Sequence, residues 1–151
     1  MVFMSGRLTR RALKLLDDAA ARLLPKSQRA AHLITGGKGE EEVYFYLRRH
    51  GYVMVARNWR SHRRKGEIDL IGWDGDTLCF IEVKTRAENT LVPAEVAVDE
   101  AKRDDLRRVA REYLKRVPGR PSVRFDLATV YYGPATKAPR ITLFKNAFPL
   151  A

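Results

Sequence analysis

Asp69, Glu82 and Lys84 carry ionisable side chains among the largely apolar strand residues of the stretch at 66–84. The apolar residues on either side of Asp74-Gly75 predict two strands joined by a tight turn. If those two residues form the loop, the strand register places Asp69 diagonal to Glu82. Side chains repeat every two residues along a strand, so Asp69, Glu82 and Lys84 then share one face of the hairpin.

Two carboxylates that converge on an apolar hairpin are costly to keep ionised unless a positive charge lies between them. A hard divalent cation meets that need, because Mg²⁺ takes oxygen ligands and is usually held by one or two carboxylates and a substrate phosphate. Lys84 supplies a point charge that can orient a water, and the carbonyl of Val83 is a further hard ligand. A surface hairpin with a Lys–Glu pair is the alternative, and a three-residue loop without a bulge would separate the carboxylates.

A longer pattern around this hairpin resembles a known family. An Asp followed by Glu-x-Lys on adjoining strands is similar to the metal-dependent nuclease superfamily of restriction endonucleases and Holliday junction resolvases. Over roughly residues 36–149 the chain resembles the bacterial YraN-type family, a small and poorly characterised group with the same nuclease-like fold. The resemblance rests on Gly39-Glu40, Leu47, Gly51-Tyr52, Arg57-Asn58-Trp59-Arg60, Gly66-Glu67-Ile68-Asp69-Leu70-Ile71, Phe80-Ile81-Glu82-Val83-Lys84-Thr85-Arg86, Arg124-Phe125-Asp126 and Asn146-Ala147-Phe148.

The resemblance implies a restriction-endonuclease-like fold and a site at which Asp69 and Glu82 hold Mg²⁺ or Mn²⁺. It also implies an activity, the hydrolysis of phosphodiester bonds in DNA, with branched or damaged DNA as the substrate in repair or recombination. Resolvase-like relatives suggest a homodimer. The sequence departs from the family at Val43, where a small residue is common, and at Glu41 and Glu42, where a less acidic stretch is common.

The chain has 151 residues and a net charge of +11, from 29 Lys and Arg against 18 Asp and Glu. This length fits one domain with a sizeable core. The charge favours a polyanionic partner, nucleic acid first and an anionic membrane second, although it can also serve solubility alone. The single cysteine, Cys79, excludes an internal disulfide and is consistent with a cytoplasmic location. No apolar run is long enough for a membrane span, and the N-terminus lacks a signal-peptide core.

Residues 8–24 carry apolar side chains at helical spacing together with many basic ones. Such a basic amphipathic helix can lie on DNA, on a membrane, on the body of the domain or on a second copy of the chain. Its Arg-rich start also resembles a transit peptide, but two aspartates in it argue against one. We interpret residues 1–35 as a helical extension, joined at a flexible Gly36-Gly37 to a nuclease-like domain at residues 36–151.

A helix over residues 38–50 is predicted to end at Gly51. Helical spacing places Glu40 at the centre of its apolar face, whereas Glu41 and Glu42 project sideways or outward. An acidic side chain amid apolar ones is unusual, so Glu40 is a candidate metal ligand, directly or through water. The alternative is that Glu40 complements the partial positive charge of the helix N-terminus, although Glu41 and Glu42 can fill that role.

The densest run of positive charge leads directly into the proposed metal strand. In a loop it would clamp phosphates beside the scissile bond, and a solvated charge run is the alternative. Arg86 leaves the second strand close to Lys84. Lys102 lies near the start of a predicted helix at 98–117, where related nucleases often place a phosphate-contacting residue. The candidate nucleic-acid-binding residues are Arg57, Arg60, Arg63, Arg64, Lys65, Arg86 and Lys102.

The expected order of elements is helix, three strands, helix, two strands, with further strands at 52–59, 122–132 and 140–145. This αβββαββ order predicts the α/β class, with one mixed sheet flanked by helices and the 98–117 helix crossing over between strands. The leading hypothesis is a Mg²⁺- or Mn²⁺-dependent DNA endonuclease. Its rivals are a non-catalytic nucleic-acid-binding module of the same fold and a membrane-surface or scaffold protein that uses residues 8–24. The candidate catalytic residues are Asp69, Glu82, Lys84 and Glu40.

Overall fold

The computed structural model describes residues 26–87, 98–133 and 138–151, and for residues 26–35 and Ala87 it describes the backbone only. The chain divides into two compact units, residues 1–35 and 36–151, and the fold below is that of the second unit. The predicted helix at 8–24, most of the connector after Arg86, and the tip of the loop between the last two strands lie outside the described residues.

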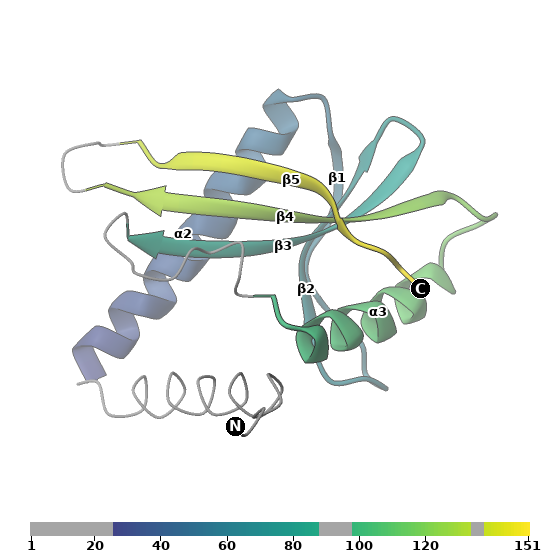
Figure 1. The fold of residues 1–151 in the computed structure, drawn as a ribbon, viewed down its shortest axis with the longest axis horizontal. Helices are drawn as coiled ribbons and strands as arrows, with labels where there is room; N and C mark the ends of the chain where they lie inside the picture. The colour runs from purple at the N-terminus through teal and green to yellow at the C-terminus, as the bar shows by residue number, and fades with distance from the viewer. Residues whose placement is uncertain (1–25, 88–97, 134–137) are drawn as a thin grey trace, which may run out of the picture. The chain divides into compact units, whose positions relative to one another are not determined.

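The second unit is built on a five-stranded mixed sheet with the strand order β1-β2-β3-β4-β5. β3 and β4 are parallel, while the other neighbouring pairs are antiparallel. The helix α3 connects the parallel pair, so it makes the crossover that parallel neighbours require. The predicted α/β class and element order are confirmed (Figure 1). The strands are β1 (Val53–Arg60), β2 (Glu67–Asp74), β3 (Thr77–Ala87), β4 (Ser122–Tyr132) and β5 (Arg140–Phe148), and the helices are α2 (Lys26–Arg49) and α3 (Glu100–Leu114).

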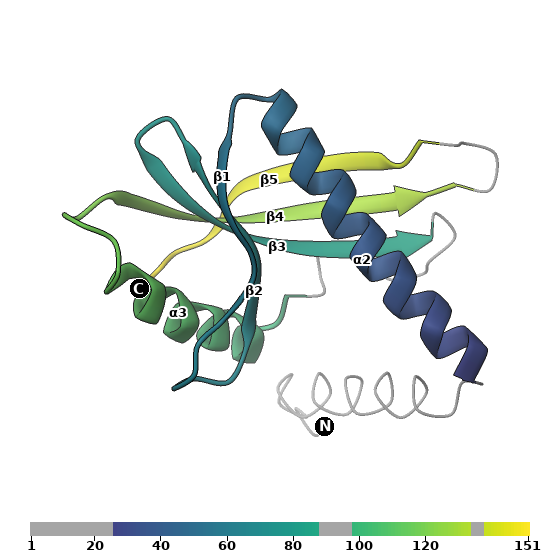
Figure 2. The same ribbon diagram turned by 180° about the vertical axis from the view of Figure 1, so that it is seen from behind.

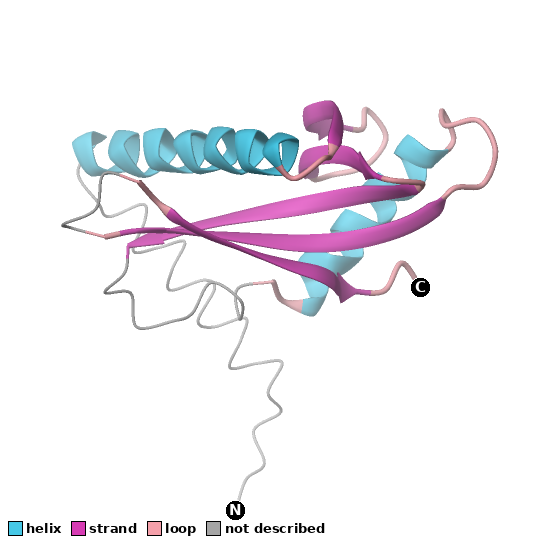
Figure 3. Cartoon of the chain, turned by 90° about the horizontal axis from the view of Figure 1, so that it is seen from above, coloured by secondary structure: helices cyan, strands magenta, loops and turns pink. Residues whose placement is uncertain are grey.

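Two apolar clusters form the core, one for each helix. Alternation along β3 and β4 separates them, because successive side chains point to opposite faces. Figures 2 and 3 show α2 running across the long strands as a separate layer. The α2 cluster consists of Val43, Leu47, Tyr52, Leu70, Cys79, Ile81, Val83, Ala128 and Val130. The α3 cluster consists of Ile68, Ile71, Leu78, Phe80, Val98, Leu106, Val109, Ala110, Phe125, Leu127 and Phe148.

The hairpin of β2 and β3 forms as predicted, but its turn is displaced by one residue. Asp74 pairs with Thr77, so the two-residue loop is Gly75-Asp76 rather than Asp74-Gly75. Gly75 has φ +59, and a two-residue turn with a glycine at its first position takes that conformation without a steric penalty. The register from which the diagonal relation was derived is therefore shifted by two residues. The paired part of the hairpin ends at Leu70–Ile81, and beyond it Asp69 meets β3 through the backbone N–H of Val83.

The helix α2 begins earlier than predicted and passes through Gly36-Gly37 without a break. The predicted junction is thus helical, which glycine permits because it costs helix stability but keeps the backbone donor that proline lacks. The boundary between the two compact units falls at the same point, between Thr35 and Gly36. Gly51, with φ +87, follows the end of the helix as predicted. At Gly39 the helix approaches the sheet so closely that an added Cβ atom would lie 1.9 Å from Oγ1 of Thr85. This close approach holds the neighbouring Glu40 against the sheet.

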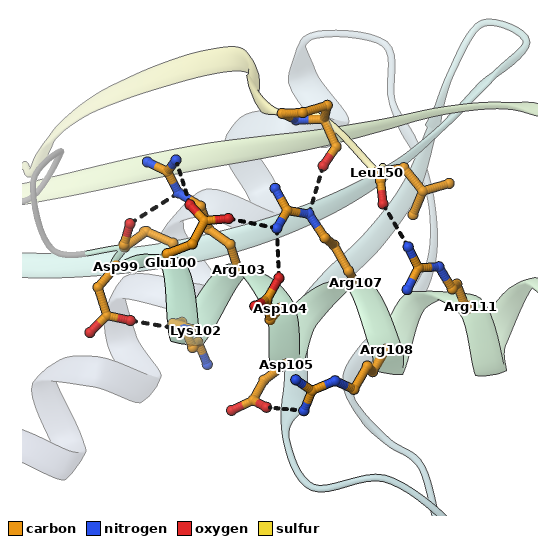
Figure 4. A network of polar contacts seen from close by, with 12 residues as sticks. Asp99, Glu100, Lys102, Arg103, Asp104, Asp105, Arg107, Arg108, Arg111 and Leu150 are labelled. Carbon is orange, nitrogen blue, oxygen red and sulfur yellow. Dashed lines mark hydrogen bonds and ion pairs between the residues drawn. The ribbon is translucent and has the colours of Figure 1, made fainter. Parts of the chain in front are cut away.

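The helix α3 is anchored at its start and along its length. At its start, the carboxylate of Asp99 accepts a hydrogen bond from the backbone N–H of Lys102 at 2.8 Å, which is an N-cap. Along its length, Arg107 and Arg111 donate to the carbonyl oxygens of Pro149 and Leu150, each at 3.0 Å, and so hold the C-terminal segment (Figure 4). These two arginines are thus occupied within the protein rather than displayed as a basic face.

Candidate functional site

Glu82 of β3 is a charged side chain buried in the sheet, with 4% of its surface exposed. Its Oε1 atom accepts a hydrogen bond from Nζ of Lys84 at 2.8 Å and lies 3.4 Å from Nζ of Lys102. Its Oε2 atom is buried and has no hydrogen-bond partner among the described residues. A buried carboxylate oxygen without a partner is costly. This oxygen therefore marks a position at which a cation or a donor from outside the chain would be stabilised.

Asp69 lies on β2 where the regular alternation of that strand breaks. Ile68 and Ile71 both belong to the α3 cluster, although they are three residues apart, and Leu70 belongs to the α2 cluster. The Oδ2 atom of Asp69 accepts a hydrogen bond from the backbone N–H of Val83 at 2.8 Å. The backbone of β3 thus orients the Asp69 carboxyl group beside Glu82.

The electrostatics of Asp69 reflect this position. Burial, and then the negative charge of Glu82, raise the pKa of Asp69 to about 8, and the charge of Glu40 acts in the same direction. The hydrogen bond from Val83 and the charge of Lys102 oppose the rise. Without a further positive charge the carboxyl group of Asp69 therefore holds its proton near neutral pH.

Glu40 reaches the site from α2 but has a partner of its own. Its Oε2 atom accepts a hydrogen bond from Nδ2 of Asn58 at 2.7 Å, and the same nitrogen donates to Glu67 at 3.0 Å. Asn58 has φ 47, a left-handed conformation that asparagine tolerates better than most residues. Of the neighbouring acids, Glu41 is exposed and Glu42 is half-buried.

The chemistry of these groups can be compared with the needs of a divalent cation. The unpartnered oxygen of Glu82 and the raised pKa of Asp69 both fit a hard cation. Within residues 26–87, 98–133 and 138–151, no group of three or more His, Cys, Asp or Glu side chains is arranged to hold a metal ion. The protein would therefore bind a cation through two carboxylates only, and backbone oxygen, water and phosphate would be the remaining ligands. The assignment of Mg²⁺ or Mn²⁺, with the Val83 carbonyl and Glu40 as additional ligands, stays a prediction.

The predicted nucleic-acid-binding residues do not all lie in one environment. Arg57, Arg63 and Lys65 are exposed. Arg60 forms an ion pair with Glu67, and Nε of Arg64 lies 3.9 Å from Glu112. Arg86 is half-buried and donates to the carbonyl oxygen of Thr85, while Lys102 contacts Glu82.

Sequence reasoning missed one polar residue next to the site, Thr129 of β4. It lies directly across the parallel pair from Lys84, is fully buried, and its Oγ1 atom has no described hydrogen-bond partner. A threonine within an apolar strand gives no signal of this kind, because the hydroxyl matters only through the residue paired with it. The contact between Lys102 of α3 and Glu82 of β3 was also not predicted, because it forms only when the crossover helix packs beside that strand.

A second polar cluster lies at the other end of β2. Arg124 donates to both carboxylate oxygens of Asp126, at 2.7 and 2.9 Å, and to Asp74 at 2.8 Å. Lys145 donates to the same oxygen of Asp74 at 2.8 Å. Asp126 is fully buried and its charge is matched, so this cluster is closed and stabilises the fold.

No helix in the described ranges is long and apolar enough to cross a membrane. A family model described as "Uncharacterised protein family UPF0102" matches residues 39–130. A UPF0102 protein of Koribacter versatilis is 50% identical over 143 residues, which cover 95% of this chain and 96% of the relative. One of Solibacter usitatus is 42% identical, over 89% of this chain and 98% of the relative. One of Porphyromonas gingivalis is 38% identical, over 80% of this chain and 88% of the relative.

Proposed function

Since the chain belongs to the uncharacterised protein family UPF0102, the YraN-type family that its motifs resemble, we propose that it is a metal-dependent DNA endonuclease. The observation that carries the proposal is the buried Oε2 atom of Glu82. This atom has no described partner and lies beside a second carboxyl group, that of Asp69, whose pKa is raised. A protein that only needed a stable fold would gain from an apolar residue at either position.

Each residue of the site has a task in this proposal. Asp69 and Glu82 are the ligands of a divalent cation, which when bound polarises a phosphate and lowers the pKa of a water. Val83 orients Asp69 through its backbone N–H. Lys84 and Lys102 contact the Oε1 atom of Glu82, which leaves Oε2 as the atom that would hold the cation. Lys84 is also placed to orient a water or to stabilise negative charge on phosphorus.

The DNA would be held by the exposed cations that precede β2. Arg63 and Lys65 are exposed, and they lie on the segment that leads into the strand of Asp69. Contacts of this kind to phosphates give affinity without sequence preference. Branched and damaged DNA are the proposed substrates, and DNA is the proposed partner.

The test is single-turnover cleavage of labelled linear, flapped and four-way DNA with Mg²⁺, Mn²⁺ or EDTA. We expect cleavage with either metal, no cleavage in EDTA, and loss of cleavage in Glu82→Gln. Asp76→Asn is the matched control, since it removes one carboxylate from the exposed turn of the same hairpin. If the wild type cuts no substrate with any metal, the proposal fails. If Glu82→Gln cuts as well as the wild type, the activity comes from elsewhere.

One observation favours a second candidate, a non-catalytic nucleic-acid-binding module. Lys84 and Lys102 both contact Glu82, an arrangement that neutralises this carboxylate without a metal. If the protein is such a binding module, metal titrations should show no binding, while salt-sensitive binding of the same DNA panel remains. Calorimetric titration of the wild type with Mn²⁺ in the presence of uncut DNA separates the two candidates.

A further inference from the structure

A cleft of about 370 Å³ lies where the end of α2 meets the start of β1, away from the carboxylate pair. It is lined by Tyr44, Arg48, Tyr52, Val53 and Met54, and none of these five residues is acidic. Val53, on the edge strand β1, is 63% exposed, so the cleft is open to a ligand from solvent.

The walls of the cleft combine aromatic rings with guanidinium groups. The guanidinium carbon of Arg48 lies 5.9 Å from the centre of the Tyr44 ring, and that of Arg57 lies 5.1 Å from it. Unstacked nucleobases bind on aromatic rings and on guanidinium planes, and nearby cations hold the backbone of the strand. The chemistry of the cleft therefore matches an unpaired nucleotide.

Side-chain contacts between α2 and β1 link the cleft to the Glu40 end of the candidate site. Glu40 contacts Asn58 at the site, and one helical turn further the Tyr44 ring contacts the neighbouring Arg57. Another turn brings Arg48 to the cleft. At 1.5 Å per residue, the eight residues from Glu40 to Arg48 span about 12 Å, a distance that a few nucleotides of a single strand bridge.

We propose that this cleft binds an unpaired strand that extends from a DNA duplex, so that the protein selects junctions between double- and single-stranded DNA. The inference rests on the proposed function in taking DNA as the ligand of the carboxylate site. Arg48, Arg57 and the Tyr44 ring supply affinity for bases and phosphates of any sequence, because every base has a face that stacks. The exposed edge of β1 leaves room for the strand to continue.

Fluorescence anisotropy in EDTA tests this proposal without cleavage, using the full chain, a blunt duplex and the same duplex with an oligothymidine tail. We expect the wild type to bind the tailed duplex roughly tenfold more tightly than the blunt one, as expected of one base stacked on an aromatic ring. Tyr44→Ala and Arg48→Ala should abolish this preference. Tyr44→Phe should keep it, because the ring remains.

Arg49→Ala is the matched control, because it removes the same charge from the neighbouring position of α2 but does not line the cleft. It should weaken binding of both duplexes alike and leave the preference intact. Thermal unfolding shows whether each variant is folded. If Tyr44→Ala is not folded, the comparison of Arg48→Ala with Arg49→Ala decides whether the cleft binds the tail. A wild type without a tail preference, or equal effects of Arg48→Ala and Arg49→Ala on it, overturns the proposal. Tail preference without any metal-dependent cleavage keeps this inference and removes the endonuclease.

Discussion

Asp69 and Asp74 lie on the same strand, β2, yet the protein moves their pKa values in opposite directions. Burial and then the charge of Glu82 raise the pKa of Asp69 to about 8. Hydrogen bonds from Lys145 and then Arg124 hold that of Asp74 at about 2. The residue type is the same, so the difference comes from the surroundings: burial and a neighbouring carboxylate act on Asp69, whereas two hydrogen-bonding cations act on Asp74. The chain itself supplies cations to Asp74, whereas at the Asp69 end the Oε2 atom of Glu82 has no described hydrogen-bond partner.

The same contrast holds for the two buried acids of the sheet, Asp126 and Glu82. Both oxygens of Asp126 accept hydrogen bonds from Arg124, and one of them also accepts from the backbone N–H of Asn146 at 2.9 Å. One oxygen of Glu82 has no described partner. A closed network stabilises a fold, while an open one costs stability and is kept where a ligand completes it. The proposed function accounts for this difference by giving Glu82, and not Asp126, a ligand from outside the chain.

The largest expected effect is that of Asp69→Asn on cleavage. Loss of the charge should lower the single-turnover rate with Mn²⁺ by about a thousandfold or more, since the metal loses a ligand. DNA binding through the basic residues should remain, and the metal-free protein should not be destabilised. Calorimetric titration with Mn²⁺ should show a parallel loss of metal affinity. If Asp69→Asn cuts as fast as the wild type, the open end of β2 is not a catalytic site.

At the closed end the effect should be on stability instead. Arg124→Met leaves Asp126 buried without its partner, and breaking such a pair commonly costs about 3 kcal/mol or more. Arg108→Met is a matched control, because Arg108 is an exposed partner of Asp105 on α3 and such pairs contribute about 1 kcal/mol or less. Urea unfolding measures both. A small loss of stability for Arg124→Met would mean that the closed network does not stabilise the fold.

The opposite pKa shifts predict opposite dependences of stability on pH, measured by urea unfolding in EDTA. The folded protein binds a proton at Asp69 up to about pH 8, whereas the unfolded chain releases it near pH 4. The contribution of Asp69 to stability therefore falls as the pH rises from about 4 to 8. Asp74 is ionised in the folded protein down to about pH 2, so its contribution is lost as the pH falls from about 4 to 2.

Two variants separate these limbs of the pH profile. Relative to the wild type, Asp69→Asn should gain stability progressively between about pH 4 and 8. Asp74→Asn should be less stable than the wild type near neutral pH, and the deficit should shrink below about pH 4. Equal and parallel profiles for both variants would mean that the two carboxyl groups share one environment.

Much of the fold, including the β2–β3 hairpin and the crossover helix, could be predicted from the sequence because the signals for these elements are local. Alternation on either side of Asp74-Gly75 predicted the hairpin, and the 98–117 pattern predicted the crossover that makes β3 and β4 parallel. The turn was placed one residue early because the pair Asp-Gly indicates a loop without showing which residue enters it first. Gly75 enters first, since it adopts φ +59. The predicted face of each side chain was not affected by this error, because the register changed by two residues and side chains repeat every two residues.

The contacts that distinguish the two ends of β2 could not be predicted in the same way. Lys102 reaches Glu82 across the crossover, and Arg124 reaches Asp74 from another strand. Both contacts join residues far apart in the sequence, and each depends on which strands are neighbours. The family pattern included Arg124-Phe125-Asp126 but gave no reason for it. The structure supplies one, since Arg124 matches two carboxylates at once.

The smallest expected effect concerns arginines rather than acids, and it extends the comparison to the surface. Arg124 is held by two carboxylates, whereas Arg63 is exposed and Arg64 has Glu112 only at 3.9 Å. Replacing Arg63 and Arg64 with Ala should leave stability nearly unchanged, because little is buried there. DNA binding should weaken for all sequences alike, and the slope of log K against log salt should fall by roughly 0.9 for each phosphate that the variant no longer neutralises. Anisotropy titrations of one duplex over a series of salt concentrations measure this slope. An unchanged slope would show that the two side chains face solvent when DNA is bound, and the phosphate clamp would then have to be sought among the other exposed cations.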